Sequence, residues 1–241
     1  MAYDFYWISG SPNAWRAMLA LEYKGTPYVS HRLDPSKREH KTPEFLTLNP
    51  RGQVPVLNAD GSTITESLAI MAFLERTYPT PPLFGETPAE TGLIWQRIFE
   101  VVNYLRDPIE TGVVRVISYG EAMKDPEATK TTASVATARL DWLEDMLARE
   151  PYLAGESASA ADIATMPIIE MLARFGAKPD AITLALGFDD LGRTHPSIAA
   201  WLERLQTVRG YDAAYPPHWR NNKTISVGRR EIKKALRPLA V

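Results

Sequence analysis

The first third of the chain alternates between short apolar segments of strand length and segments with a helical period. Residues 4–9 form a short, aromatic-rich segment, and residues 28–33 form a second one, as expected of strands. Between them, apolar residues recur at positions i, i+3, i+4 and i+7: Ala14, Ala17, Met18 and Leu21. Because this spacing places them on one face of a helix, the pattern predicts a β-α-β unit at the start of the chain.

The expected first helix has recognisable ends. Ser11 suits the N-cap, where a hydroxyl accepts a backbone N–H, and Pro12 suits the first helical position. Gly25 and Pro27 end the periodic segment, as residues that stop helices do. The sequence therefore predicts a helix that begins directly after Ser11.

A second unit with a different order of elements follows. A short helical stretch is expected near residues 43–48, and then two strands over 55–58 and 63–65. These strands flank Asp60-Gly61, a dipeptide favoured in tight hairpin turns, and another helix begins near residue 67. The order β-α-β and then β-β-α ends at the prolines 79, 81 and 82, which stiffen an extended connection and indicate a domain boundary.

Beyond the prolines the periodicity is helical throughout. Long helices are expected over about 89–119, 126–149, 160–174 and 196–208, and Pro108 is expected to kink or break the first of them. We therefore predict an α+β domain over residues 1–80, an all-helical domain over 88–215 and a basic tail over 216–241. Ser159 and Asp162 have the spacing of a capping box, which assigns them to folding.

Composition limits the chemistry. The 241 residues include no cysteine, which excludes disulfides, thiolate metal sites and a protein thiol as nucleophile. The four histidines (His31, His40, His195 and His218) are not spaced as metal ligands, so no metal site is expected. No apolar run approaches the length of a membrane span and the N-terminus lacks the pattern of a signal peptide, so we expect a cytoplasmic protein that does not enter membranes.

Charge is unevenly distributed along the chain. The last 22 residues carry seven Lys or Arg and one Glu, a net charge of +6, whereas the whole chain has −2. A solvated tail that lies across an acidic body is the favoured interpretation, and an anionic partner is the alternative. Nucleic acid is not expected as a partner, because the tail has no interleaved aromatic residues and no nucleic-acid motif.

Three motifs give the chain a family resemblance. Residues 49–55, Asn-Pro-Arg-Gly-Gln-Val-Pro, are followed by residues 65–70, Thr-Glu-Ser-Leu-Ala-Ile. Further on, Gly155 precedes Ser-Ala-Ala-Asp-Ile at 159–163. In type and spacing these segments resemble the glutathione transferase superfamily over about residues 3–208. The resemblance implies a thioredoxin-like βαβ-ββα N-terminal domain followed by an all-helical C-terminal domain.

The resemblance also implies a binding site for glutathione. The bond before Pro55 is expected to be cis, so that the backbone of Val54 pairs with the peptide like an added strand. Ser67 at a helix N-terminus is expected to hold the γ-glutamyl carboxylate, and Glu66 the ammonium. His40, Lys41 and Gln53 match positions that contact the glycyl end in the serine-using classes. Ser67 is otherwise an ordinary N-cap, and the His40-Lys41 pair is otherwise solvated surface.

Activation of the glutathione thiol is assigned to Ser11. A thiol with a pKa of ~8.5 must shift by about 1.5 units to be mostly ionised at neutral pH, and one charge-assisted hydrogen bond of about 1.5 to 3 kcal/mol is enough. Ser9 is the second choice, and a purely structural N-cap at Ser11 is the alternative. A tyrosine mechanism is disfavoured, because Trp7 takes the matching strand position and Tyr6 faces the other side of the sheet.

The expected function is therefore that of a glutathione transferase in detoxification: glutathione is ionised at Ser11 and adds to a small hydrophobic electrophile. Residues 14–21 resemble the zeta class, the maleylacetoacetate isomerases, whereas the region from His40 to Ser67 resembles the theta and phi classes. Dehalogenation, ether cleavage and isomerisation use the same thiolate and stay open. A glutathione transferase-like binding or regulatory module without catalysis is the other alternative. The resemblance implies a homodimer.

Overall fold

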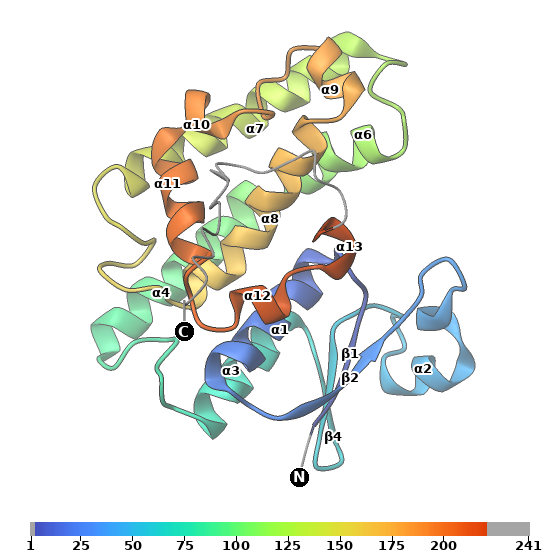
Figure 1. The fold of residues 1–241 in the computed structure, drawn as a ribbon, viewed down its shortest axis with the longest axis vertical. Coiled ribbons are helices and arrows are strands. Elements are labelled where there is room, and N and C mark those ends of the chain that lie inside the picture. The colour runs from blue at the N-terminus through green and yellow to red at the C-terminus, as the bar shows by residue number, and fades with distance from the viewer. Residues whose placement is uncertain (1–2, 221–241) are drawn as a thin grey trace, which may run out of the picture.

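The computed structural model describes residues 3–220, which form a four-stranded sheet with helices and then a larger helical half (Figure 1). The strands are β1 (Tyr3–Trp7), β2 (Tyr28–Arg32), β3 (Val56–Ala59) and β4 (Ser62–Thr65). Their order is β2-β1-β3-β4, with β2 parallel to β1 and the other neighbours antiparallel. This is the predicted thioredoxin-like βαβ-ββα arrangement, and the fold class is confirmed.

Local sequence explains the elements around the sheet. β1 buries Tyr3, Phe5 and Trp7 on one face, as its alternating pattern requires. Asp60 and Gly61, which connect β3 and β4, both have positive φ angles of 50° and 86°, as a tight hairpin turn demands. The helices of this half are α1 (Pro12–Lys24), α2 (Pro43–Leu48) and α3 (Ser67–Thr77), and α1 packs against α3.

The helical half begins with one run over residues 88–118. It consists of α4 (Pro88–Glu100), a π-helical turn at Val101–Leu105, α5 (Arg106–Ile109), a second π-helical turn at Glu110–Arg115, and α6 (Val116–Ser118). A kink or a break was expected at Pro108, and the run continues past it without a break. Pro108 has no backbone N–H to donate, and wider π-helical turns on both sides of it let the helix continue without that hydrogen bond.

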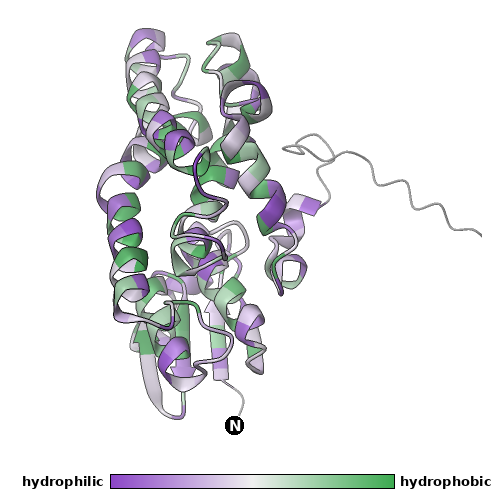
Figure 2. Ribbon diagram, turned by 90° about the vertical axis from the view of Figure 1, so that its left-hand side faces the viewer, coloured by the Kyte–Doolittle hydropathy of each residue, from purple (hydrophilic) through white to green (hydrophobic). Residues whose placement is uncertain are grey.

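The remaining helices surround α8 (Ala160–Gly176), which is buried along most of its length and contacts α1, α4 and the second π-helical turn. The others are α7 (Pro126–Leu147), α9 (Pro179–Thr183), α10 (Leu191–Thr194), α11 (Pro196–Leu205), α12 (Tyr211–Ala214) and α13 (Pro217–Arg220). Outer helices alternate between hydrophilic and hydrophobic positions, as helices with one buried face do (Figure 2). The four long helices match the sequence prediction, whereas the short ones were not foreseen.

Polar contacts fix the start of α8. Ser159 caps the helix, and the carboxylate of Asp162 accepts hydrogen bonds from the backbone N–H groups of Leu153 and Ser159, both at 2.9 Å. It also accepts from the Ser159 hydroxyl at 2.9 Å and from the indole N–H of Trp201 at 2.8 Å. The predicted capping box is confirmed. Complete burial raises the pKa of Asp162, and these hydrogen bonds oppose the rise.

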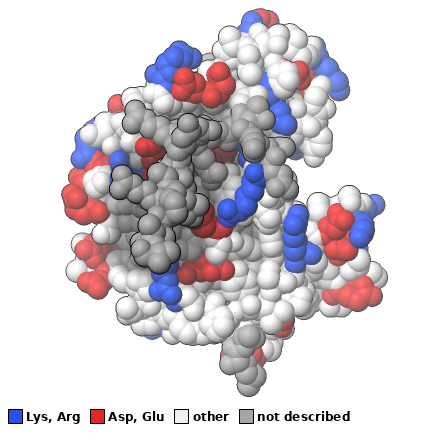
Figure 3. Space-filling view, in the orientation of Figure 1, with Lys and Arg blue, Asp and Glu red and all other residues white. Residues whose placement is uncertain are grey.

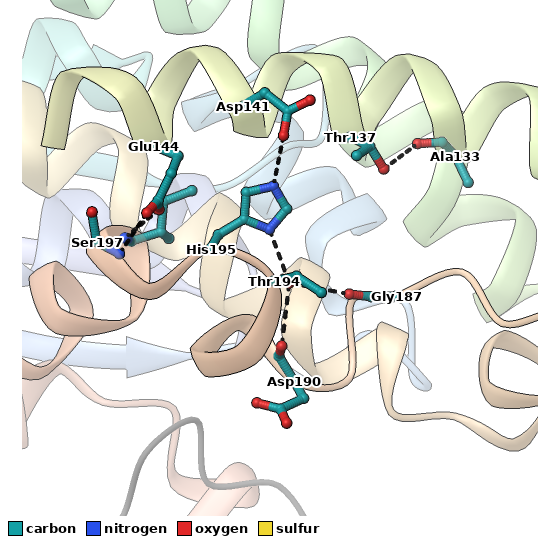
Figure 4. Close-up of polar contacts among 10 residues, drawn as sticks. Ala133, Thr137, Asp141, Glu144, Gly187, Asp190, Thr194, His195 and Ser197 are labelled. Carbon is teal, nitrogen blue, oxygen red and sulfur yellow. Dashed lines mark hydrogen bonds and ion pairs between the residues drawn. The ribbon is translucent and has the colours of Figure 1, made fainter. Parts of the chain in front are cut away.

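A second polar cluster joins α7 to the start of α11 (Figure 4). The carboxylate of Glu144 on α7 accepts the backbone N–H groups of Ser197 and Ile198 at 2.8 and 2.9 Å, which caps α11 from outside. Beside it, the buried His195 ring lies 3.2 Å from Asp141 and 2.9 Å from the hydroxyl of Thr194. His195 therefore belongs to the framework of the helical half.

The last described segment returns to the first helix (Figure 1). α12 packs on α1, and Trp15 of α1 meets the rings of Tyr215 and Trp219 edge-on, with centroids 5.4 and 5.5 Å apart. Arg174 at the end of α8 stacks on Trp219, with its guanidinium carbon 4.4 Å from the ring centroid. These contacts hold residues 211–220 against the β1–α1 connection.

Candidate active site

The register of the sheet brings the predicted site residues to one edge. Tyr6 of β1 pairs with Val56 of β3, which pairs with Thr65 of β4, so residues just before β3 and just after β4 lie beside the end of β1. β2 is parallel to β1 and ends at the same edge, where the N–H of Leu33 bonds to the carbonyl of Trp7 at 2.8 Å. The segments after β2, before β3 and after β4, which are distant in sequence, therefore converge around the start of α1.

Ser11 is the N-cap of α1, as predicted. Its side-chain oxygen accepts the N–H of Ala14 at 3.3 Å, and its φ and ψ angles of −73° and 120° are extended. Ser11 is half-buried, and the only hydrogen bond that its hydroxyl makes within residues 3–220 is this acceptor bond. The hydroxyl proton thus remains free to be donated to a ligand at the positive end of α1.

The segment before β3 presents backbone groups. The Val54–Pro55 bond is cis, as the resemblance implied. Neither the N–H nor the C=O of Val54 is hydrogen-bonded to another described residue. Gln53 is exposed, and its carbonyl accepts the side-chain amide of the buried Asn49 at 2.8 Å, which holds this loop in place. Val54 therefore offers an unused donor and acceptor in the manner of an open strand edge.

The start of α3 differs from the expected cap. Glu66, not Ser67, takes the N-cap position, with φ and ψ angles of 67° and 117° and no side-chain cap bond. Ser67 is the first helical residue and is 5% exposed. A φ and ψ pair of this kind is strained in a residue other than glycine. Because the Glu66 side chain makes no cap bond, the first N–H groups of α3 have no side-chain cap, as an anion site at a helix N-terminus requires.

Glu66 already has a cationic neighbour. Its carboxylate lies 3.2 Å from the guanidinium of Arg51, and the two side chains are 68% and 60% exposed. An ion pair this exposed contributes little to stability. The carboxylate can therefore exchange Arg51 for another cation at low cost.

His40 and Lys41 lie against the loop that precedes Val54. The ammonium of Lys41 donates to the carbonyl of Arg51 at 3.1 Å, and a side chain at Gly52 would collide with Lys41 and with the backbone of His40. Gly52 has a φ of 59°, so both its conformation and this close approach require glycine. Burial and the charges of Lys41 and Arg38 lower the pKa of His40, which keeps its ring neutral at neutral pH.

Sequence reasoning named Ser9 as the second choice for activating the thiol but missed its partner, His218. Ser9 Oγ lies 2.6 Å from Nδ1 of His218, a contact that spans 209 positions of the chain. These two residues line a cavity of about 460 Å³ together with residues from the end of β2 and beyond: Arg32, Leu33, Asp34 and Pro35. In Figure 3 the molecule is hollowed between its two halves, with Lys and Arg side chains at the rim. No local signal near His218 indicates this role.

The competing tyrosine site is not formed. The buried Trp7 donates its indole N–H to Ser30 at 2.8 Å, and Tyr6 stacks on His31 with centroids 4.5 Å apart. Burial raises the pKa of Tyr6, with a smaller contribution from the charge of Asp4. A phenol with a raised pKa is a poorer donor to a thiolate.

Residues 3–220 contain no group of three His, Asp or Glu side chains that could hold a metal ion. In the same part of the chain no helix is both long and apolar enough to cross a bilayer.

Comparison with known proteins places this geometry in a family. The glutathione S-transferase N-terminal domain matches residues 10–77, and the glutathione S-transferase C-terminal domain matches residues 108–207. The chain is 30% identical over 222 residues to glutathione S-transferase A of Pleuronectes platessa, which covers 88% of this chain and 91% of the relative. It is 32% identical over 168 residues to maleylacetoacetate isomerase of Mus musculus, which covers 67% of this chain and 74% of the relative.

A solved structure agrees with these matches. The crystal structure of a glutathione S-transferase from the Antarctic clam Laternula elliptica superposes with a TM-score of 0.78 at 30% identity, and covers 93% of this chain and 96% of that one. The chain belongs to the glutathione S-transferase superfamily. The resemblance drawn from the motifs is thereby confirmed, together with the prediction of a glutathione S-transferase enzyme that uses glutathione.

Proposed function

We propose that this protein ionises the thiol of glutathione at Ser11 and transfers the sulfur to a small hydrophobic electrophile in a detoxification reaction. The observation that carries the proposal is the state of Ser11: a hydroxyl at the N-terminus of a 13-residue helix, with its proton uncommitted within residues 3–220. A charge-assisted hydrogen bond and the helix N-terminus together supply the roughly 2 kcal/mol that ionisation at neutral pH requires.

The tripeptide is bound along the same edge of the sheet in this proposal. Val54 pairs with its backbone, since its N–H and C=O have no partner among the described residues. The uncapped start of α3 at Ser67 receives the γ-glutamyl carboxylate, and Glu66 leaves Arg51 to hold the ammonium. Gln53, Lys41 and His40 attend the glycyl end, and the contact of Lys41 with the loop supports this placement.

Assembly and location belong to the same proposal. A homodimer is supported by large hydrophobic side chains that the monomer leaves exposed on the run from α4 onward, among them Phe99 at 53% and Tyr104 at 57%. Light scattering should give twice the mass of one 26.9 kDa chain. We place the enzyme in the cytoplasm, where glutathione keeps thiols reduced.

Calorimetry with glutathione alone tests the first step. Binding at millimolar concentration or tighter is expected from wild type, with conjugation of an aryl or benzyl halide in a coupled assay. Binding without any conjugation across a panel of electrophiles would favour a binding or regulatory module that has kept the fold. No binding at all would overturn the proposal.

A further inference from the structure

Ser9 and His218 form a hydrogen-bonded pair beside the cavity. His218 is on α13, the last described helix, and reaches the loop between β1 and α1. Its ring packs closely on that loop: a side chain at Gly10 would come within 2.8 Å of Cε1 and 3.3 Å of Nε2. Gly10 has a φ of 85° and directly precedes Ser11, so the ring lies next to the residue assigned to the thiolate.

The position of His218 is held from two sides. The next residue, Trp219, is buried against Trp15 of α1 and under Arg174 of α8. The hydrogen bond to Ser9 then fixes the rotation of the ring. A side chain that is fastened through its neighbour and through its own Nδ1 has a defined direction, as a group that acts on a substrate needs.

The hydrogen bond also defines the remaining ring nitrogen. When the Ser9 hydroxyl donates to Nδ1, the imidazole proton is on Nε2, because a neutral ring has one donor and one acceptor nitrogen. No described residue hydrogen-bonds with Nε2, which is the ring nitrogen near Gly10. In this tautomer, His218 presents an unused N–H donor beside the cavity.

Charged groups around the ring keep it neutral. Burial lowers the pKa of His218, and the positive charges of Arg174 on α8 and Arg32 on β2 lower it further. Asp34 is the acidic side chain among the residues that line the cavity, and hydrogen bonds from Ser36 lower its pKa. At neutral pH the ring is thus a hydrogen-bond donor without a charge.

We propose that His218 is a further catalytic residue, which donates a hydrogen bond from Nε2 to an oxygen that becomes negative as the glutathione sulfur attacks the adjacent carbon. The inference rests on the function proposed above and favours, among its substrates, electrophiles with an oxygen at the reacting centre, such as epoxides. The sulfur forms a bond to carbon, the carbon–oxygen bond of the ring breaks, and its electron pair goes to oxygen. Water then supplies a proton to that oxygen, and His218 keeps its own.

A matched pair of electrophiles tests this role. Benzyl chloride expels chloride from its benzylic carbon, whereas attack at the comparable benzylic carbon of styrene oxide leaves an alkoxide on the neighbouring carbon. The quantity to measure is the ratio of kcat/KM for styrene oxide to kcat/KM for benzyl chloride, which cancels effects on glutathione binding and ionisation. His218→Asn keeps an amide near the Ser9 hydroxyl but has no donor at the place of Nε2, and His218→Gln restores one.

We expect His218→Asn to lower this ratio by about tenfold and His218→Gln to recover most of it, since the removal of one donor to a developing oxyanion costs at least that much in enclosed sites. Ser9→Ala should lower the ratio less, because the ring is retained and only the hydrogen bond that selects its tautomer is lost.

An unchanged ratio in His218→Asn, or a loss that His218→Gln does not recover, would overturn the inference. If wild type binds glutathione and converts benzyl chloride but not styrene oxide, this inference alone fails. If wild type converts neither and does not bind glutathione, the proposed function fails as well.

Discussion

Within residues 3–220, two helices have a serine as their N-cap residue, and the difference between them separates structure from chemistry. At the start of α8, Ser159 and Asp162 satisfy each other, and Asp162 in addition holds Leu153 and Trp201, all out of contact with solvent. At the start of α1, Ser11 is half-buried and makes one long bond of 3.3 Å to Ala14. The residue type is the same, but only Ser11 has capacity left for a ligand.

The start of α3 extends this comparison. Glu66 occupies its N-cap in a strained conformation and gives the helix no side-chain bond. A helix start whose polar groups are all hydrogen-bonded within the protein stabilises the fold. A helix start with N–H groups that lack a partner can bind a ligand there. The predictions below therefore compare the N-termini of α8, α1 and α3, which differ in how many hydrogen bonds each makes within the protein.

The largest effect is expected at α8. Asp162→Ala removes the acceptor of four buried hydrogen bonds and leaves donors on Leu153, Ser159 and Trp201 without partners. We expect a loss of about 3 to 5 kcal/mol in the free energy of unfolding, because hydrogen bonds to charged groups and orphaned buried donors are each costly. Urea unfolding measures it. A loss under 1 kcal/mol would show that the capping box is dispensable.

The next effect is on catalysis. Ser11→Ala removes the donor to the thiolate, so the pKa of bound glutathione should rise by about one to two units and conjugation at neutral pH should fall about ten- to a hundredfold. Stability should drop by only ~1 kcal/mol, the cost of a lost cap.

Ultraviolet absorbance of the thiolate, titrated with glutathione bound, gives the decisive reading. Ser159→Ala is the matched control, since it removes a capping serine without touching the thiol. If Ser11→Ala and wild type ionise glutathione at the same pH, Ser11 is a cap like Ser159.

A smaller change is expected in affinity at α3. Ser67→Ala should weaken glutathione binding about tenfold, the loss of one hydrogen bond to a charged carboxylate, and leave kcat nearly unchanged. Calorimetry and steady-state kinetics separate the two quantities. Ser62→Ala, at the exposed start of β4, is the control. An equal fall in kcat would mean that Ser67 acts on the transition state, contrary to the division of roles proposed here.

The smallest effect concerns pH. His40 and His218 both have pKa values lowered by burial and by neighbouring cations. The unfolded chain therefore binds protons at a higher pH than the folded protein, and stability is lost as pH falls below about 6.5 and through the lowered folded values. Thermal unfolding between pH 7 and pH 5 should show this fall, and it should be shallower in His218→Gln. A Tm that rises on acidification would contradict the argument.

The sequence predicts the sheet, the long helices and the serine at the start of α1, because each depends on local patterns. Alternation defines β1, a periodic stripe and a capping serine define α1, and Asp60-Gly61 defines the hairpin. The strained N-cap at Glu66 was missed, because Ser67 has the better capping side chain.

Long-range contacts could not be predicted in this way. Arg16 lies on α1 and is 1% exposed, and burial lowers the pKa of its guanidinium to about 10, against the opposing charge of Glu110. A helical pattern assigns an arginine to solvent, and only the packing of the helical half on α1 buries it. The contact of His218 with Ser9 is of the same kind. Of the basic tail predicted over residues 216–241, residues 221–241 lie outside the described residues.

The aromatic contact between Trp15 and residues 211–220 has a consequence for biosynthesis. Trp15 is synthesised about 200 residues before Tyr215 and Trp219, which cover it. At a synthesis rate of about 5 to 20 residues per second, this face of α1 waits on the order of 10 to 40 seconds for its cover. During that time the nascent chain displays a hydrophobic surface that a chaperone can bind, and release depends on completion of the very end of the fold.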